Sequence, residues 1–347
     1  MSADNLDAVD LAAVLRGGII NEDVLQAITD VSNIPLPFSD RVGTMSSRNQ
    51  FREWTQDRLQ DIDLDNAATD GSDFVKTDEN TGTRVGNRHQ ILTKDIAVST
   101  RARTVDTVGF SDTLAYQIMM RTREARRDLE AISLENQASV ADDGGATPGR
   151  LGALGSWLAT NTSRGVGSVD GGFSTGTGFT VAPTPGTARG LTETLVRDIS
   201  QAVWESGGNT DTIMSNPAMI RGLSEFLFDS SARIATLRRE AGPGVEAATA
   251  IGSVNLFLTD FGQALEMVPN RLQQTHVDAV DVQVVDLYFI DWELLAHSWL
   301  HSWRADPIGK PGLSDKRQIS GDVTLVVLNE EGLGVIADLD PTIAVVV

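Results

Sequence analysis

The sequence contains no cysteine among its 347 residues. Disulfide frameworks, thiolate metal sites and cysteine nucleophiles are therefore excluded. No apolar run approaches the ~20 residues of a membrane-spanning helix. The N-terminus, MSADNLDAVD, is acidic where a secretory signal is basic and then apolar. We therefore expect a chain that is made in the cytoplasm, has no membrane partner, and is stabilised by packing and association.

Positive charge is also scarce, because 28 Lys and Arg face 48 Asp and Glu, for a formal net charge of -20. A negative chain resists nonspecific adhesion to nucleic acid or anionic lipid. The charge is uneven, since residues 1–80 hold sixteen acids and six bases whereas residues 81–127 hold four acids and nine bases. We call residues 81–127 the basic waist. Only four of the 28 cations are lysine. This bias favours bidentate pairing of arginine with carboxylates across interfaces, although a GC-rich genome would produce the same bias.

The length and the 41% hydrophobic content predict a folded chain of two or three lobes. Residues 1–39 read as an arm, and residues 40–108 are polar with two period-two pieces at 51–59 and 91–99. This alternation predicts a projecting β-hairpin, with residues 66–87 as the connection. So few apolar residues cannot stabilise a hairpin alone in water. No core-like segment adjoins it in the sequence, so we expect it to pack on another chain.

Residues 111–137 show the clearest helical pattern, with Ser111 as the expected N-cap. One apolar stripe is expected to face the core, namely Leu114, Ile118, Ala125, Leu129 and Ile132. The other face carries four arginines of the basic waist and is too cationic to be buried. The following residues 142–186 contain twelve glycines and few long apolar side chains, which predicts a long flexible loop.

A compact α+β lobe is predicted next. A helix over 189–206 should end at Gly207, and a third helix should start at Pro217 with Asn216 as its cap. The remaining sequence is rich in strands, and the segments with strand character are 212–214, 254–258, 265–268, 282–292, 294–303, 323–328 and 334–338.

Candidate chemistry is weak throughout the sequence. The spacing Asp61-x-Asp63-x-Asp65 matches the start of a calcium loop, but the later ligand positions fail, so we read it as an acidic solvated stretch. On an alternating strand His297 and His301 would share a face at ~13 Å, too far apart for one metal ion. No nucleotide-binding or hydrolase motif is complete, and only four lysines are present to form a covalent network. We therefore expect no catalytic residue, no cofactor and no metal site.

Five short motifs, in this order, carry a resemblance across nearly the whole chain: LGALGSWL (151–158), LTET to GG (191–208), IMSNP (213–217), TDFG (259–262) and GDVTLVVLN (321–329). None of them is a catalytic signature. In this order the chain resembles the major capsid proteins of tailed bacteriophages with the Hong Kong 97-type fold, and more narrowly the podovirus-like branch named after phage SU-ten.

The resemblance implies an α+β Hong Kong 97-type capsid fold. The implied parts are an N-terminal arm (1–39), an extended E-loop hairpin (40–108), a P-domain (109–150) with its spine helix (111–137), a glycine-rich loop (151–186), an A-domain (187–281), and returning P-domain strands with the C-terminal tail (282–347). It also implies a major capsid protein, not an enzyme, that self-assembles as hexamers and pentamers into an icosahedral shell around double-stranded DNA.

The resemblance further implies assembly in the host cytoplasm and a final location in the virion capsid. A separate scaffolding protein and a portal are the expected partners, a decoration protein is a further candidate, and the packaged DNA would be held without sequence-specific contact. Two alternatives stay open, an encapsulin-like cellular shell protein and a carboxylate-dependent soluble enzyme.

We expect each subunit to lay its E-loop over a neighbour's spine helix, with the basic waist pairing with acidic segments of that neighbour. High salt should weaken such pairing. The candidate inter-subunit contacts are Trp54, Ile91, Arg84, Arg88, Arg121, Arg126, Arg127, Asp61 and Asp63.

Overall fold

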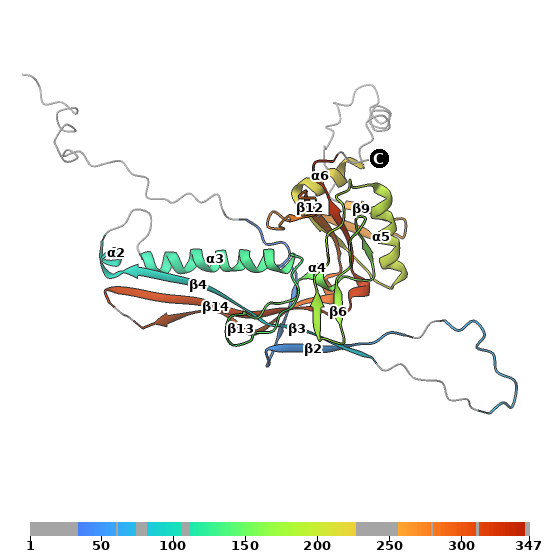
Figure 1. The fold of residues 1–347 in the computed structure, drawn as a ribbon, viewed down its shortest axis with the longest axis horizontal. Helices are drawn as coiled ribbons and strands as arrows, with labels where there is room; N and C mark the ends of the chain where they lie inside the picture. Colours follow the sequence, from blue (N-terminus) through green and yellow to red (C-terminus); the bar gives the residue numbers. More distant parts are fainter. Residues whose placement is uncertain are drawn as a thin grey trace, which may run out of the picture.

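The structure, a computed structural model, describes residues 34–59, 62–73, 82–105, 112–226, 256–278, 280–309 and 312–343. An elongated lobe consists of a long twisted sheet with helix α3 lying along it, and a compact lobe stands at one end of that sheet (Figure 1). None of the helices within the described residues is long and apolar enough to cross a membrane.

The long sheet is four-stranded, in the order β1-β13-β14-β4. Its strands are β1 (Gly43–Ser46), β13 (Leu295–Ile308), β14 (Ser314–Val327) and β4 (Gln90–Ser99). Strands β13 and β14 are longer than the apolar pattern predicted, because their distal halves carry polar residues on the open face of the sheet. In β4 the side chains alternate, so that Leu92, Ile96 and Val98 are buried while Ile91 faces solvent.

Helix α3 (Thr113–Ser133) covers one face of this sheet and begins two residues later than expected. Its N-cap is Asp112, whose Oδ1 accepts the Leu114 N–H at 2.9 Å, whereas Ser111 lies outside the described residues. The predicted stripe faces the core, since Leu114, Ala125 and Leu129 are buried and the two isoleucines pack against the buried clusters. The short helix α2 (Thr100–Thr104) precedes it.

The expected pairing of 51–59 with 91–99 is wrong. Strand β2 (Phe51–Gln56) pairs instead with β3 (Thr83–Arg88), and β4 pairs with β14 along its whole length. Only His89 separates the end of β3 from the start of β4. The continuous extended stretch 83–99 therefore contributes one strand to the β2–β3 hairpin and another strand to the long sheet. Strand β4 has a partner surface within its own chain because its apolar side chains pack under α3.

The compact lobe is built on a seven-stranded sheet whose main path runs β5-β15-β12-β8-β10-β9, with β11 paired to β12. These strands are β5 (Thr162–Ser163), β8 (Thr212–Ser215), β9 (Leu256–Leu258), β10 (Ala264–Pro269), β11 (His276–Val277), β12 (Gln283–Ile290) and β15 (Gly334–Leu339). Helices α5 (Glu193–Glu205) and α6 (Pro217–Phe226) pack on one face, and their apolar sides form a second buried cluster with the sheet.

The stop and start signals of these two helices are confirmed. Gly207 follows α5 with φ of 87°, a left-handed conformation that glycine adopts without strain. At α6 the Asn216 Oδ1 accepts the Met219 N–H at 3.0 Å, ahead of Pro217 in the first turn. Short 3-10 turns η1 (Trp292–Leu294) and η2 (Glu330–Gly332) complete the lobe.

The expectation of a flexible loop across the glycine-rich residues is wrong for much of the segment. Leu151, Leu154, Trp157 and Leu158 are at most 1% exposed and belong to the largest core cluster. The segment contains the short helix α4 (Leu154–Trp157) and a small hairpin, β6 (Gly172–Ser174) with β7 (Phe179–Val181). Its glycines permit close approach of backbone strands, while its few large side chains fill the space between the two lobes.

The prediction that His297 and His301 share one face is also wrong. His297 lies opposite the core residue Leu325, whereas His301 lies opposite Asp322 on the open face. A register shift between Trp299 and His301 reverses the alternation, so that side chains after the shift point to the opposite face of the sheet from the one expected.

Candidate assembly surfaces

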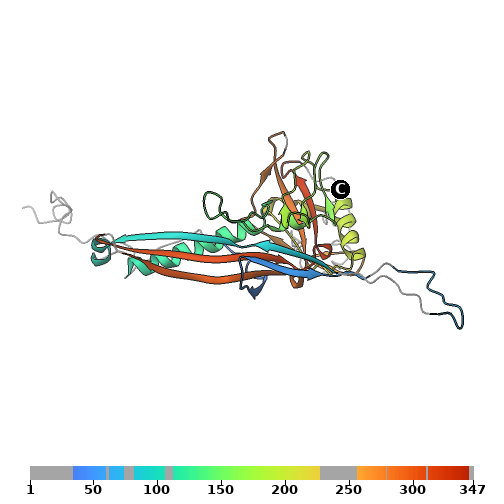
Figure 2. The same ribbon diagram turned by 60° about the horizontal axis from the view of Figure 1, so that its bottom comes forward.

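Residues 57–59 and 62–73, which lie between β2 and β3 in the sequence, project away from the body of the molecule (Figure 2). Three large apolar side chains on it are almost fully exposed: Leu59 at 91%, Ile62 at 88% and Leu64 at 96%. Burying one such side chain stabilises a protein by about 2 kcal/mol, so these three side chains would contribute substantial free energy if a partner surface covered them. We call residues 57–59 and 62–73 the projecting segment, and such a set of exposed apolar side chains is typical of a surface that binds a partner.

The projecting segment is also acidic, because residues 62–73 contain four aspartates and no cation. The Asp63 Oδ1 accepts the Asp65 N–H at 2.9 Å, which closes a local turn and does not build a cation site. Asp61 lies outside the described residues. Within the part of the chain that the structure covers, no group of three acidic or histidine side chains is arranged to hold a metal ion.

Several arginines of the basic waist already have carboxylate partners in their own chain. Among the predicted contact residues the pairs are Arg84–Glu53, Arg121–Glu124 at 2.6 Å and Arg126–Asp40 at 2.7 Å. Such exposed pairs contribute little to stability, but they neutralise the local charge. Uncompensated positive charge must therefore come from other arginines of the waist.

Arg123 supplies that charge on α3. It is exposed and has no carboxylate partner among the described residues, and Met119 is exposed four residues before it. Arg127 is half-buried, and its buried Nε has no hydrogen-bond partner in the described part of the chain. The outer face of α3 thus combines an exposed apolar side chain with an exposed unpaired cation, which is the chemistry that complements the projecting segment.

Trp54 and Ile91 occupy different environments. Trp54 is half-buried and packs on Trp157 of its own chain, with ring centroids 5.3 Å apart. Ile91 is 58% exposed on the open face of the long sheet. Of these two predicted contact residues Ile91 is the more exposed, and the inter-subunit role of both stays a prediction.

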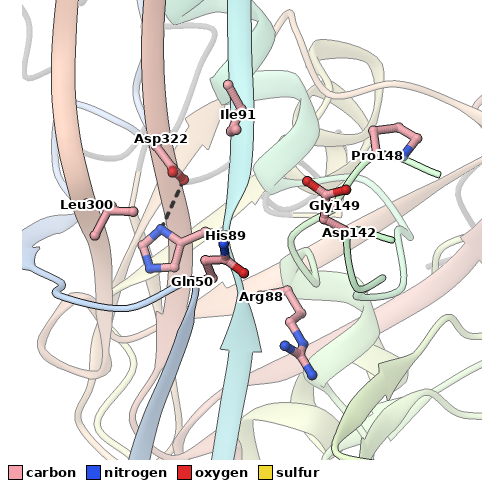
Figure 3. Close-up of a pocket in the computed structure, with 9 residues that line it drawn as sticks. All are labelled: Gln50, Arg88, His89, Ile91, Asp142, Pro148, Gly149, Leu300 and Asp322. Atoms are coloured by element: carbon pink, nitrogen blue, oxygen red, sulfur yellow. Dashed lines mark ion pairs between the residues drawn. The ribbon is translucent and has the colours of Figure 1, made fainter. Parts of the chain in front are cut away.

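Ile91 and Arg88 meet at a cavity of about 180 Å³ beside the root of the hairpin (Figure 3). The Arg88 guanidinium lies between two aromatic rings, 4.4 Å from Phe51 and 5.2 Å from Phe179. The remaining lining residues are Gln50, His89, Asp142, Pro148, Gly149, Leu300 and Asp322.

A buried histidine–aspartate pair forms one wall of this cavity (Figure 3). The His89 Nδ1 is 3.2 Å from the Asp322 Oδ1, but neither ring nitrogen of His89 makes a hydrogen bond with the described residues. The lining residues include no serine, threonine, cysteine or lysine that the histidine could activate. The cavity therefore has one polar wall, formed by this pair.

Sequence reasoning missed a cluster of charges in the compact lobe. The His276 Nε2 lies 3.6 Å from Asp286 and 3.7 Å from Asp338, and the Asp338 Oδ2 accepts the Gly165 N–H at 2.8 Å. Burial lowers the pKa of His276, but the attraction of the Asp338 and Asp286 carboxylates outweighs it, so the pKa is raised. Burial raises the pKa of Asp338, but the nearby His276 and the backbone N–H groups that donate to this carboxylate leave its pKa lowered. The cluster holds the glycine-rich segment to the sheet.

Comparison with known proteins adds the family. The family model of the SU10 major capsid protein matches residues 7–340. The chain is 27% identical over 333 residues to the major capsid protein of Escherichia phage Phieco32, covering 86% of this chain and 89% of that protein.

Solved structures share the fold at low sequence identity. The capsid of cyanophage Pam1 has a TM-score of 0.56 at 12% identity, covering 97% of this chain and 98% of that one. The capsid of a native GTA particle also scores 0.56 at 12% identity, with 95% and 99% covered. The SrpI encapsulin from Synechococcus elongatus scores 0.52 at 10% identity, with 93% and 94% covered.

The fold alone fits both a phage capsid and an encapsulin, but the family match separates them, because it spans almost the whole chain. The protein is thus a structural shell component of the phage virion, and its family is not one of enzymes. With its α+β Hong Kong 97-type fold, the chain belongs to the SU10 major capsid protein family.

Proposed function

We propose that copies of this chain assemble as hexamers and pentamers into a closed icosahedral shell around the double-stranded DNA of a tailed phage. The projecting segment of each copy acts as the E-loop and lies on the elongated lobe of its neighbour. In this proposal the elongated lobe is the P-domain with α3 as spine helix, and the compact lobe is the A-domain. The GTA capsid was solved with C5 symmetry, which supports five-fold clusters of this fold.

One observation carries the proposal, namely the near-complete exposure of Leu59, Ile62 and Leu64 on a segment that stands away from its own body. A monomer gains nothing from this arrangement, whereas a lattice of identical copies buries every such segment. Contacts that are weak individually then add up around the closed lattice.

The outer face of α3 is the surface we propose for the segment. The segment offers aliphatic side chains alternating with aspartates, and α3 offers Met119 beside the unpaired Arg123. Opposite charges steer the two surfaces together, and the apolar contacts hold them. A portal is proposed as a further partner, since a closed symmetric shell needs an entry point for DNA, and a separate scaffolding protein is proposed to guide closure.

The test replaces Leu59, Ile62 and Leu64 together by serine. All three are exposed, so circular dichroism and thermal unfolding of the subunit should not change. Loss of about 6 kcal/mol for the three side chains of each segment should raise the protein concentration needed for assembly about 10,000-fold, so that particles disappear from negative-stain micrographs.

The matched control replaces Ala67 and Ala68 by serine in the same segment, which removes little apolar area and should leave particles intact. Normal particle yield from the triple variant at the wild-type concentration would contradict the proposal.

A further inference from the structure

Glu130 is a buried carboxylate in the last turn of α3, with 0% of its surface exposed. It accepts three short hydrogen bonds, from the Phe38 N–H at 2.8 Å, the Ser39 N–H at 2.7 Å and the Asn270 Nδ2 at 2.7 Å. All three contacting groups are N–H donors, and the two carboxylate oxygens of Glu130 accept all three hydrogen bonds. Because a negative charge is unfavourable at the C-terminal end of a helix, Glu130 depends on these donors.

The first two donors belong to residues 36–42, which we call the arm root because residues 1–33 precede it in the chain. The arm root folds into a tight turn, in which the Asp40 N–H donates to the Leu36 carbonyl at 3.0 Å and the Val42 N–H donates to the Phe38 carbonyl at 3.0 Å. The Phe38 ring is fully buried, with its centroid 5.8 Å from the Trp292 ring. The arm root is therefore part of the core and has a defined direction.

Ion pairs hold the arm root to both lobes. Asp40 bonds Arg126 of α3 at 2.7 Å. Arg41 makes a bidentate pair with Glu266 of β10 at 2.6 and 3.0 Å. The first pair belongs to the elongated lobe and the second to the compact lobe, so seven residues join the two.

The third donor links Glu130 directly to the compact lobe. Asn270 is fully buried and immediately follows β10. Its backbone N–H donates to the Ser215 carbonyl at 2.8 Å and its Oδ1 accepts the Leu272 N–H at 2.9 Å, which fixes the amide and turns Nδ2 toward Glu130. The Glu130 carboxylate thus joins three parts of the molecule: α3 of the elongated lobe, to which it belongs, the end of β10 in the compact lobe, and the arm root.

We propose that Glu130 is the positioning residue for the N-terminal arm: it fixes where the chain before residue 36 leaves the subunit, and it ties that exit to the angle between the two lobes. The inference rests on the proposed assembly and goes beyond it, because the projecting segment plays no part in it. Every copy then holds the arm root at the same place and in the same direction relative to its own two lobes. A rotation between the lobes that moves Asn270 away from Glu130 would release the arm root.

The test compares Glu130→Gln with wild type by amide hydrogen exchange of the unassembled subunit. The glutamine is isosteric, but its NH2 group must face at least one of the N–H donors. The amides of Phe38 and Ser39 should exchange about 10- to 100-fold faster, while protection in α3 and the seven-stranded sheet is unchanged. Particles assembled from the variant should vary in size. The control Glu135→Gln removes an exposed charge near the same helix end and should change neither readout.

Three results would overturn the inference. They are unchanged exchange at residues 38 and 39, loss of protection throughout the molecule, and fast exchange at the arm root together with particles as uniform as wild type. Should Glu130→Gln not fold, Asn270→Ala keeps the carboxylate and removes one donor. It should give the same local acceleration on a smaller scale, and no acceleration would count against the inference. Failure of wild type to form particles would instead refute the proposed assembly.

Discussion

His297 shows how one buried side chain sets a pH limit on the subunit. It is 2% exposed, and its Nε2 lies 3.1 Å from the Ser133 Oγ. Burial lowers its pKa from 6.5 to about 4. The unfolded chain therefore binds a proton between pH 6.5 and 4 that the folded chain does not, and stability falls as pH drops through this window.

We predict that His297→Gln reduces this acid sensitivity. At neutral pH the variant should be less stable, because it replaces a packed ring, but its free energy of unfolding should fall by on the order of 3 kcal/mol less than that of wild type between pH 6.5 and 4. Urea unfolding across this range measures the difference.

His276→Gln serves as a control, because the pH dependence of stability that His276 contributes is opposite in sign to that of His297. The raised pKa of His276 adds stability that is fully present below pH 6.5 and is lost as pH rises through the folded-state value. Parallel pH profiles for wild type and His297→Gln would refute the predicted role of His297.

At the scale of single elements, the sequence pattern predicts where helices lie better than it predicts which strands pair. The apolar stripes of α3, α5 and α6, the stop at Gly207 and the cap at Asn216 are local signals read within one or two turns, and the structure follows them. The N-terminal ends differ, because α3 is capped by Asp112 and not by Ser111, and α5 is capped by Thr192 and begins four residues later than expected. Strand pairing is not local, since β4 finds β14 more than 200 residues away. An alternating pattern marks a strand but does not name its partner.

The expectation of a flexible loop over the glycine-rich segment is wrong for a related reason. Twelve glycines in 45 residues look like a flexible connection, yet several of them stand where backbone segments touch. A Cβ at Gly165 would lie 2.1 Å from the Thr187 carbonyl oxygen, and one at Gly155 would lie 1.9 Å from the Asn136 Oδ1. Composition alone cannot distinguish a glycine needed for close packing from one that merely loosens the chain.

We predict that Gly165→Ala destabilises the subunit by about 1–3 kcal/mol, because the obstructing atom belongs to the backbone and cannot turn away. The control is Gly176→Ala, since a Cβ at Gly176 meets nothing within 4 Å. That change should alter stability by less than about 0.5 kcal/mol. Denaturant midpoints measure both, and equal midpoints would show that the contact at Gly165 relaxes freely.

For the whole molecule, the dominant electrostatic fact is the net charge of -20 on each copy. Crowding such copies into a shell produces long-range repulsion, which must be overcome by short-range apolar burial and by local pairing of acids with unpaired arginines. Arg84, Arg121 and Arg126 are already paired with carboxylates of their own chain. Fewer arginines are therefore free to pair with acidic residues of a neighbouring copy.

We predict that Arg123→Glu raises the concentration needed for assembly about 10-fold or more in ~10 mM salt, where the Debye length is about 30 Å. Light scattering against subunit concentration measures the threshold. The defect should shrink in ~1 M salt, because the charges are then screened beyond about 3 Å.

Arg123→Lys keeps the charge and should assemble like wild type. An equal defect at both salt concentrations would show that Arg123 acts through packing and not through its charge.

Some properties of this protein follow from the sequence by itself. These are the absence of covalent cross-bracing by cysteine, the acidic net charge, the three main helices with the stop at Gly207 and the cap at Asn216, and the likeness to a phage capsid subunit. Each depends on composition or on residues close together in the chain. Only the tertiary structure decided which strand pairs with which, that the glycine-rich segment is core, that several waist arginines are already neutralised, and that Glu130 holds the arm root to both lobes. These depend on contacts between residues tens to hundreds of positions apart, which the packing of the whole chain selects and no local pattern encodes.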